Sequence, residues 1–413
     1  MPNNNSYNVW FTNREYLCII NMKGFRDFNQ QQMVKRNYLE NIIKSIFRKY
    51  GFNNISTPAI EYVTHQEKDK LTYKVDADKE LRYDLTVPFA RYVMENDVIL
   101  PFKRFQIGSV WRGEKPQKGR YREFIQCDAD IIGSNSIYCE IELLQMVSEI
   151  LEKLGLNYII KINNRKVLSD IIKYINASEK EEEICILIDK LDKQPKEVVF
   201  EKLSNIGINF NIFKQLLELS NNKERITYLS SFFDLSGSEI EEVLKHVDCR
   251  FEPTLARGLS YYTGTVFEIV IKDVSIGSIA GGGRYDKLVN KSGKNISGIG
   301  ISLGFDRLYD AMEELNLFPE METVPTVMVA NFGESSLKLV EFLRSNGIAS
   351  TFYYDEHKLS KQFEYANKIG VKYVLLYGEN EMVNDKIRIK NMLSGKQDDV
   401  GKIELIKILS ETQ

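Results

Sequence analysis

The alternation of apolar and polar positions predicts a mixed α+β region over residues 22–162. Apolar residues recur at helical spacing in Asn37–Tyr50, and Gly51 follows as a C-cap. A second amphipathic helix is predicted over Ser136–Leu154, closed by Gly155. Short strands are predicted between the two helices, at Ile55–Glu61, Lys103–Trp111 and Arg122–Ile132.

The pattern changes over residues 165–247, where Lys, Glu, Ile and Leu are frequent and Gly is rare. Helical spacing dominates there, which predicts an inserted helical module; helices that merely extend the core are the alternative. Strands are predicted again over Arg250–Leu308, a segment that contains the glycine cluster Gly281–Gly283.

The dipeptide Val324-Pro325 marks a linker, and regular strand–helix alternation follows it. This alternation predicts a small α/β domain with a largely parallel sheet. Strands are predicted at Thr326–Asn331, Ala349–Tyr354 and Tyr373–Tyr377, and helices at Ser335–Asn346, Leu359–Lys368 and Lys402–Ser410.

Composition narrows the class of protein. The chain has 413 residues, 43% hydrophobic and 27% charged, as expected of a globular protein with two to four domains. No apolar run approaches the ~20 residues of a membrane helix, so we expect no membrane partner and a cytoplasmic location. Residues 1–21 resemble neither a secretory signal nor a transit peptide and are expected to form a disordered or loosely attached tail, with Met22 as a candidate alternative start.

Charge and metal-ligating residues exclude further classes. The net charge of −3 argues against a global basic field and hence against a DNA partner, so any RNA contact must use local basic patches. The five cysteines include no CxxC pair and the three histidines lie far apart, which argues against a disulfide framework, a protein-ligated metal or a Ser-His-Asp triad.

The most informative stretch is RGEKPQKGRYREFIQCDAD, residues 112–130, which places five cations in eleven residues between two predicted strands. These cations are Arg112, Lys115, Lys118, Arg120 and Arg122. Such a loop suits a polyanion held over a sheet, because the arginine fork bonds phosphate oxygens in two places. Composition alone favours the alternative, a solvated hairpin tip with scattered charge.

A resemblance decides between these interpretations. Residues 112–130 resemble motif 2 of class II aminoacyl-tRNA synthetases, in the form found in histidyl-tRNA synthetases. Other stretches resemble further elements of that family: GFNNISTPAIE (51–61, with Pro58) motif 1, GISLGFDRL (300–308) motif 3, LARGLSYYTGTVFEI (255–269) and GGGRYDKL (281–288) the two histidine signatures, and LRYDLTVPFARY (81–92) the strand that holds the substrate amino group. Residues 358–381 and 389–397 resemble the anticodon-binding domain of class IIa synthetases, so the resemblance covers nearly all of the chain from Met22 onward.

The resemblance implies an α+β fold: an antiparallel class II sheet flanked by helices, a helical insertion and a C-terminal α/β anticodon-binding domain. It implies a catalytic domain over residues 22–322, an anticodon-binding domain over 323–413, and a homodimer formed through motif 1. The implied partners are ATP, L-histidine and tRNA(His).

The implied reaction joins the histidine carboxylate to the α-phosphate of ATP, releases pyrophosphate and then loads the tRNA. Magnesium would be held mainly by ATP itself. Arg112 and Arg257 would be catalytic, at the α-phosphate. ATP would be bound by Arg112, Glu114, Arg120, Tyr121 and Arg307, and the tRNA acceptor end by Gln117 and Arg122. Histidine would be bound by Asp84, Leu85, Thr86 and Gln126 near its ammonium and by Asp130, Tyr261 and Tyr262 near its imidazole.

The sequence departs from the family pattern in three places. Ser260 replaces a common aspartate, the segment Glu61–Leu81 is shorter than usual, and Asp84 and Asp130 stand where many bacterial members have glutamate. Two other hypotheses are a non-catalytic paralogue, such as a regulatory subunit of histidine biosynthesis or a tRNA sensor, and a plain RNA-binding module. The presence of Arg112, Arg257, Arg307 and the C-terminal domain favours the enzyme.

Overall fold

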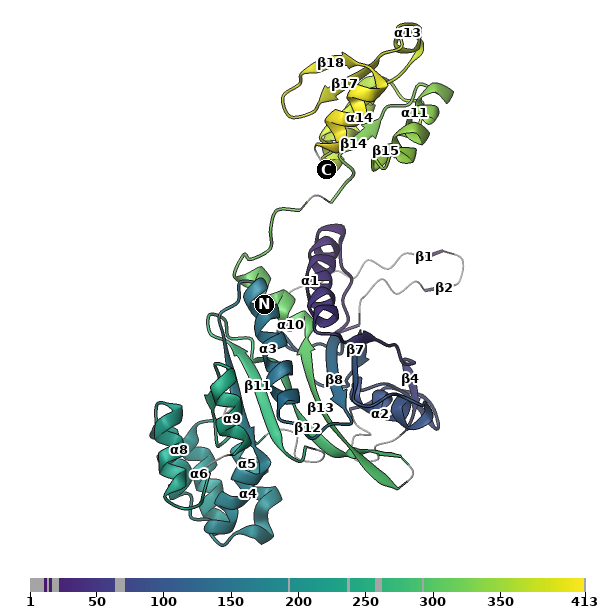
Figure 1. Cartoon of the computed structure of the whole chain (residues 1–413). Helices are drawn as coiled ribbons and strands as arrows, with labels where there is room; N and C mark the ends of the chain where they lie inside the picture. The colour runs from purple at the N-terminus through teal and green to yellow at the C-terminus, as the bar shows by residue number, and fades with distance from the viewer. Residues whose placement is uncertain are drawn as a thin grey trace. The chain divides into compact units, whose positions relative to one another are not determined.

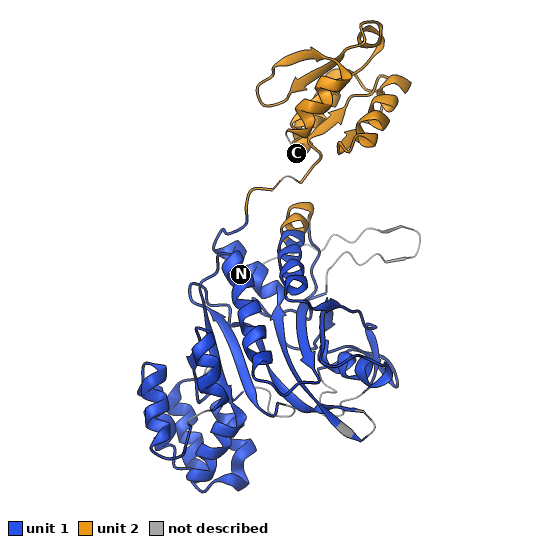
Figure 2. Ribbon diagram, in the orientation of Figure 1, with its two compact units in different colours: residues 1–28, 36–318 blue, residues 29–35, 319–413 orange. Residues whose placement is uncertain are grey.

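A computed structural model describes residues 22–63, 71–191, 194–235, 238–256, 262–291, 293–321 and 323–411, and the backbone of residues 11–12 and 15–16. The chain forms two compact units, residues 1–28 with 36–318 and residues 29–35 with 319–413 (Figure 2). A two-residue hairpin pairs β1 (Phe11–Thr12) with β2 (Glu15–Tyr16). None of the described helices is long and apolar enough to cross a membrane.

The first unit is built on an eight-stranded sheet (Figure 1). Its neighbouring strands are antiparallel except at the two edges, where β10–β9 and β3–β7 are parallel. The order is β10 (Arg250–Phe251), β9 (Tyr158–Asn164), β11 (Thr265–Ile271), β12 (Ser278–Lys291), β13 (Lys294–Gly304), β8 (Glu123–Ile132), β7 (Phe102–Trp111) and β3 (Asn53–Asn54).

One face of this sheet packs on helices. Apolar residues of α1 (Gln30–Lys49), α3 (Tyr138–Lys153) and α10 (Phe305–Glu314) share a core with the sheet residues Cys127, Ala129 and Ile131. Because side chains alternate between the two faces of a strand, Gln126, Asp128 and Asp130 face the other way. The opposite face of the sheet is therefore free to carry polar chemistry.

The helical insertion is confirmed. It comprises α4 (Arg165–Tyr174), a short 3-10 turn (Ser178–Lys180), α5 (Glu181–Ile188), α6 (Lys196–Asn205), α7 (Asn211–Glu218), α8 (Asn222–Ser230) and α9 (Glu239–His246). These helices gather beside β9 and β11 at one end of the sheet (Figure 1). Their apolar side chains belong to the same core as α3, so the insertion is joined to the sheet by a continuous hydrophobic contact.

Three sequence predictions in this unit were wrong. The strand predicted over Ile55–Glu61 is replaced by β3 and by β4 (Ile60–Tyr62), which pairs with β6 (Lys79–Leu81) and through it β5 (Lys74–Asp76). Pro58 lies between them and cannot donate a ladder hydrogen bond. Thr86–Glu95 is the helix α2, not a strand, because Pro88 falls in the first turn, where proline is tolerated.

Residues 305–308 were predicted as the end of a strand and instead begin α10.

The second unit has the strand order β15 (Ser350–Phe352), β14 (Val327–Val329), β16 (Tyr373–Leu376), β17 (Ile387–Asn391) and β18 (Gln397–Val400). Its helices are α11 (Glu334–Ser345), α12 (Leu359–Ile369), α13 (Glu379–Val383) and α14 (Lys402–Ser410). The prediction of a largely parallel sheet was right in part. The strands β15, β14 and β16 are parallel, whereas β17 and β18 pair antiparallel.

Candidate active site

A cavity of about 1070 Å³ opens on the face of the eight-stranded sheet that carries Gln126, Asp128 and Asp130. Glycines at neighbouring positions of the adjacent strands make it hollow. Gly300 is the register partner of Asp130 on β13, and a Cβ added there would lie 2.0 Å from Asp130 Oδ1. The glycine therefore makes room for the carboxylate.

The glycine cluster on β12 divides between the two faces of the sheet. Gly281 lines the cavity, where the absence of a Cβ lets the backbone face the open space. Gly282 has a different role, because its Cβ would lie 2.5 Å from the ring of Phe267 and 2.1 Å from the carbonyl oxygen of Gly300. A Cβ on Gly283 would likewise lie 2.5 Å from the carbonyl oxygen of Thr265, so the packing of the sheet itself requires Gly282 and Gly283.

The floor of the cavity carries a buried ion pair. Arg104 on β7 is fully buried, and its Nη2 lies 2.6 Å from Asp130 Oδ2, with the ring of Phe89 4.1 Å from the guanidinium. The second oxygen of Asp130 accepts a 2.5 Å hydrogen bond from the hydroxyl of Tyr285. Burial raises the pKa of Asp130 above its ordinary value, while Arg104 and the Tyr285 bond act in the opposite direction. Asp130 is therefore held in one orientation from two sides.

Gln126 lies on the same strand face and offers an acceptor to the cavity. Its Nε2 donates a 2.5 Å hydrogen bond to Ser302 Oγ, which fixes the amide. Its Oε1 is buried and has no hydrogen-bond partner among the described residues. A buried acceptor without a donor is costly, so this oxygen is suited to a ligand N–H.

The entrance to α2 supplies a third acidic group. Asp84 Oδ1 accepts hydrogen bonds from the backbone N–H groups of Thr86 (3.2 Å) and Val87 (3.0 Å). The carboxylate is thus fixed at the N-terminus of a helix, where negative charge is favoured. Asp84 and Thr86 both line the cavity.

The cationic loop between β7 and β8 forms another wall. Its tip is a tight turn in which Gln117 and Arg120 exchange backbone hydrogen bonds, with Gly119 at φ +70°. At its base, Arg112 Nε donates to the carbonyl oxygen of Tyr83 (3.2 Å), and the guanidinium lies 4.3 Å from the Tyr83 ring. Within the described residues neither Nη of Arg112 makes a hydrogen bond, so two donors of a fixed cation face the cavity.

Other side chains of the loop are tied to one another and to α10. Arg120 Nε lies 3.0 Å from Glu114 Oε2, and Arg307 Nε donates to the carbonyl oxygen of Gly119 (2.7 Å). The hydroxyl of Tyr121 donates to Asp310 (2.8 Å), and burial together with this bond raises the pKa of Tyr121 to about 12. These contacts give the loop a defined shape before any ligand binds.

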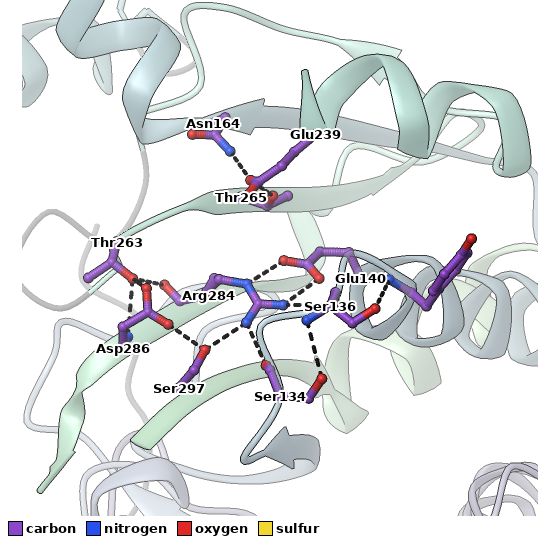
Figure 3. A network of polar contacts seen from close by, with 11 residues as sticks. Ser134, Ser136, Glu140, Asn164, Glu239, Thr263, Thr265, Arg284, Asp286 and Ser297 are labelled. Atoms are coloured by element: carbon purple, nitrogen blue, oxygen red, sulfur yellow. Dashed lines mark hydrogen bonds and ion pairs between the residues drawn. The ribbon is translucent and has the colours of Figure 1, made fainter. Parts of the chain in front are cut away.

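A buried polar network secures the start of β11 and the middle of β12 (Figure 3). Arg284 forms two 2.6 Å bonds to the carboxylate of Glu140 on α3 and also bonds Ser297 Oγ. Thr263 donates a 2.5 Å hydrogen bond to Asp286, which in turn accepts from Ser297. Thr263 lies within the first signature (255–269), so the network fixes the part of that signature that leads into β11.

Comparison with known proteins matches this architecture over nearly the whole chain. The family model described as histidyl-tRNA synthetase matches residues 24–308, and that described as anticodon binding domain matches residues 324–412. The chain belongs to the histidyl-tRNA synthetase family. It is 42% identical to the histidine–tRNA ligase of Cytophaga hutchinsonii, over 91% of this chain and 96% of that one, and 40% identical to that of Porphyromonas gingivalis, over 91% and 95%. A crystal structure of histidyl-tRNA synthetase from a Nostoc species has a TM-score of 0.81 and 28% identity, and covers 96% of this chain and all of that one.

The cavity gathers most of the residues that the resemblance to histidyl-tRNA synthetases picked out. It is lined by Asp84, Thr86, Arg112, Glu114, Gln117, Arg120, Tyr121, Gln126, Asp130, Tyr262 and Arg307. Leu85 and Arg122 do not line it: Leu85 is fully buried, and Arg122 Nε donates to the carbonyl oxygen of Glu114 (3.2 Å). Arg257, Ser260 and Tyr261 lie outside the described residues.

Several cavity residues were missed by sequence reasoning. Asp128 lines the cavity, and Arg104 pairs with Asp130 at its floor; the only signal was the alternation that puts Asp128 on the same strand face as Gln126 and Asp130. Asp189 and Glu182 reach the cavity from the insertion, so this module also borders the site of a histidyl-tRNA synthetase. No spacing along the chain connects the insertion with residues that follow it by almost a hundred positions.

Proposed function

We propose that this cavity is where the chain, a histidine–tRNA ligase, joins histidine to AMP and then transfers it to the 3′ end of tRNA(His). The observation that carries the proposal is the kind of polar group on each wall of a single cavity. Its floor presents the acceptors Asp84, Gln126 and Asp130, and its loop presents the cation Arg112. An amino acid with an ammonium and an imidazole fits the first set, and a triphosphate fits the second.

In the first step the histidine carboxylate attacks the α-phosphorus of ATP. A P–O bond forms, the bond to the bridging oxygen breaks, and pyrophosphate leaves with its electron pair. Negative charge grows around the phosphorus, and a prepositioned cation stabilises it most where water is excluded. Within the described residues neither Nη of Arg112 makes a hydrogen bond, which supports this role. Arg257 is proposed to act beside it.

Other loop residues are proposed to seat ATP. Arg307 and Arg120 both line the cavity beside the loop, and Glu114 holds Arg120 in place. The bond of Tyr121 to Asp310 supports a positioning role for that tyrosine in the ATP site. Gln117 is proposed to meet the acceptor end of the tRNA, with Arg122 outside the cavity, where an RNA strand approaches.

The histidine side of the cavity is proposed to read both ends of the substrate. Asp84, Thr86 and Gln126 would bind the ammonium, and Asp130 and Tyr262 the two ring nitrogens, with Tyr261 as a wall. Leu85 would contribute only its backbone, because its side chain is buried. Amino acids without an imidazole would forgo the bonds to Asp130 and Tyr262, which disfavours them.

Magnesium is proposed to reach the cavity on the phosphate oxygens of ATP. Within the described residues no group of three His, Cys, Asp or Glu side chains could hold a metal ion. The donor set therefore fits an ion held chiefly by the nucleotide, and the metal would shield phosphate charge while Arg112 orients the reacting phosphate.

The remaining partners are also proposals. We propose a catalytic domain over residues 22–322 and an anticodon-binding domain over 323–413, which would contact tRNA(His). A homodimer through the motif 1 region is supported by exposed apolar side chains in this part of the first unit, among them Ile60, Tyr62, Ile99 and Leu100. We also propose that the chain acts in the cytoplasm, without membrane or DNA partners.

The test is histidine-dependent exchange of labelled pyrophosphate into ATP, followed by charging of tRNA(His). We expect both activities, and exchange with histidine alone among the twenty amino acids. A folded protein that binds tRNA or histidine but shows no exchange would contradict the proposal and favour a non-catalytic regulator instead.

A further inference from the structure

Asp128 is a third acidic side chain on the cavity floor, and none of the motifs assigns it a role. It lies between Gln126 and Asp130 on the same face of β8, is 2% exposed and lines the cavity. Its register partners on the neighbouring strands, Gln106 and Ser302, are neutral. Asp128 therefore sits between the proposed ammonium site and the proposed imidazole site.

The three floor carboxylates differ in their partners. Asp130 is paired with Arg104 at 2.6 Å, and Asp84 accepts two backbone hydrogen bonds at the start of α2. Within the described residues, no lysine or arginine lies within 4.0 Å of Asp128. A buried carboxylate without a cation is expensive, so its presence in a ligand cavity indicates that the ligand brings the cation.

The neighbouring side-chain amide of Gln126 indicates which kind of cation the site would bind. Gln126 Nε2 lies 3.5 Å from Asp128 Oδ1 and 2.5 Å from Ser302 Oγ, so the amide turns its Oε1 away from both. That oxygen is the buried acceptor without a partner. A carboxylate and an amide oxygen two residues apart on one strand face suit a compact cation with several N–H groups, and an ammonium has three.

We propose that Asp128 is a histidine-binding residue whose carboxylate pairs with the α-ammonium group of the substrate. The inference rests on the proposed function, since it takes histidine as the ligand. It assigns the ammonium three acceptors of the floor and α2, namely Asp84, Gln126 Oε1 and Asp128. Asp130, which already pairs with Arg104, is then left to the imidazole.

The surroundings of Asp128 make this binding dependent on protons. Burial raises the pKa of Asp128 to about 7; Arg104 on β7 and a hydrogen bond with Ser302 on β13 lower it, and Asp130 on its own strand and Asp84 before α2 raise it. Arg82 is a further charged group that interacts with Asp128. Near pH 7 about half of the empty sites therefore hold a proton on Asp128. Ammonium binding favours the carboxylate and releases this proton to solvent, so affinity should rise with pH up to about 8.

The test compares two imidazole ligands, only one of which carries the ammonium group. Histidinol carries the imidazole and the ammonium, whereas 3-(imidazol-4-yl)propanoate carries the imidazole without the ammonium. Binding of each is measured by calorimetry at pH 8 for the wild-type chain and for Asp128→Asn, with Asp398→Asn as the matched control. Asp398 lies on the exposed edge of β18 in the second unit.

We expect Asp128→Asn to weaken histidinol about 10- to 100-fold, the range for a charged hydrogen bond, and to leave the propanoate unchanged. Calorimetry at pH 7 in buffers of different ionisation enthalpy should show that histidine releases about half a proton more per site from the wild type than from the variant. Asp398→Asn should match the wild type in every measurement.

Equal weakening of both ligands would place Asp128 at the imidazole and overturn the inference, and so would unchanged binding of both. Loss of ligand binding together with loss of the near-UV circular dichroism signal would indicate that Asp128→Asn is misfolded. The inference is then decided by comparing proton release from the wild type with that from Asp128→Glu, which retains the acid. Pyrophosphate exchange by the wild type is measured alongside. Exchange by the wild type together with unchanged ligand binding by Asp128→Asn would contradict this inference alone. Absence of exchange would contradict the proposed function.

Discussion

At the scale of single residues, the site depends on charges that are fixed before ligand binds. Arg112 is held by Tyr83 from its Nε side, and Asp130 is held by Arg104 and Tyr285. Such preorganised groups need little reorientation during the reaction, which is the main source of electrostatic catalysis. The consequence is that conservative changes at these positions should be costly.

Arg112→Ala should lower pyrophosphate exchange by roughly 10²–10³-fold, because it removes a fixed cation from the growing phosphate charge. Arg112→Lys should recover only part of this loss, since an ammonium cannot bond two phosphate oxygens with one planar fork. Exchange kinetics measure both. Arg388→Ala, at an exposed arginine paired with Asp399 in the second unit, is the control and should keep full exchange. Near-normal exchange by a folded Arg112→Ala would remove Arg112 from the proposed mechanism.

Asp128→Asn should stabilise the empty protein at alkaline pH. The folded pKa of about 7 lies above the unfolded value of about 4, so the native state binds more protons between these values. Stability contributed by the neutral acid is full below pH ~4 and is lost as pH rises to ~7, at a cost of up to about 4 kcal/mol. We expect the variant to exceed the wild type by about 1–3 kcal/mol at pH 8, because the asparagine avoids the charge but keeps the desolvated polar group. Urea unfolding at pH 4.5 and pH 8 measures it, and an equal difference at both pH values would contradict the assignment.

At the scale of elements, each strand of the site serves two faces. The even-numbered residues of β8 from Phe124 to Asp130 line the cavity, and the odd-numbered residues from Ile125 to Ile131 pack in the core. Glycines on β12 and β13 then keep the cavity open. The geometry of the site is thus largely a property of the sheet, and a methyl group in the wrong place should disturb it.

Gly300→Ala should raise the Michaelis constant for histidine much more than that for ATP. The added Cβ would lie 2.0 Å from Asp130 Oδ1, so either the carboxylate or the strand must move. A displacement of this size should reduce kcat/KM for histidine by about 10–100-fold. Gly401→Ala is the matched control, because no atom lies within 4 Å of its added Cβ. If both alanine variants exchanged pyrophosphate alike, the close approach at Gly300 would have no functional meaning.

Elements with long, regular patterns could be predicted from the sequence, and short ones could not. The predicted helix Lys402–Ser410 and the strand ending at Trp111 agree with α14 and β7. The predictions around Pro58 and Pro88 were wrong, because short apolar runs beside proline are compatible with a strand, a turn or a helix start. In the site, motif residues came from resemblance. Arg104 and Asp128 were missed because alternation predicts which face a side chain occupies, but not that a cavity lies there.

At the scale of the whole molecule, the two units have separate hydrophobic cores. The clusters around Leu143 and Phe89 lie in the first unit, and those around Leu339 and Met328 lie in the second. The last helix of the first unit ends at Glu314, and the first strand of the second begins at Val327. A cut between Phe318, which packs on the first core, and Val324, which packs on the second, divides no core.

Deletion of residues 323–413 should therefore leave a folded protein that performs the first step but not the second. We expect pyrophosphate exchange within about threefold of the full chain, and charging of tRNA(His) reduced by roughly 10²-fold or more through lost phosphate contacts. Steady-state charging and exchange measure the two effects, and sedimentation checks that the oligomeric state is unchanged. A truncated protein that charged tRNA at the full rate would refute the RNA-binding role of the second unit.

The two-faced strand β8 also bears on how the chain avoids misfolding. If β8 slipped by one residue against β7 or β13, Asp128 and Asp130 would enter the core beneath α3, and Ala129 and Ile131 would be left in the cavity. Asp130 would then lose Arg104, and both carboxylates would lose the polar floor, a penalty of several kcal/mol for each buried charge. The acids that we assign to substrate binding thus also penalise mispaired sheets. Natural selection for catalysis and selection for folding fidelity act here on the same side chains.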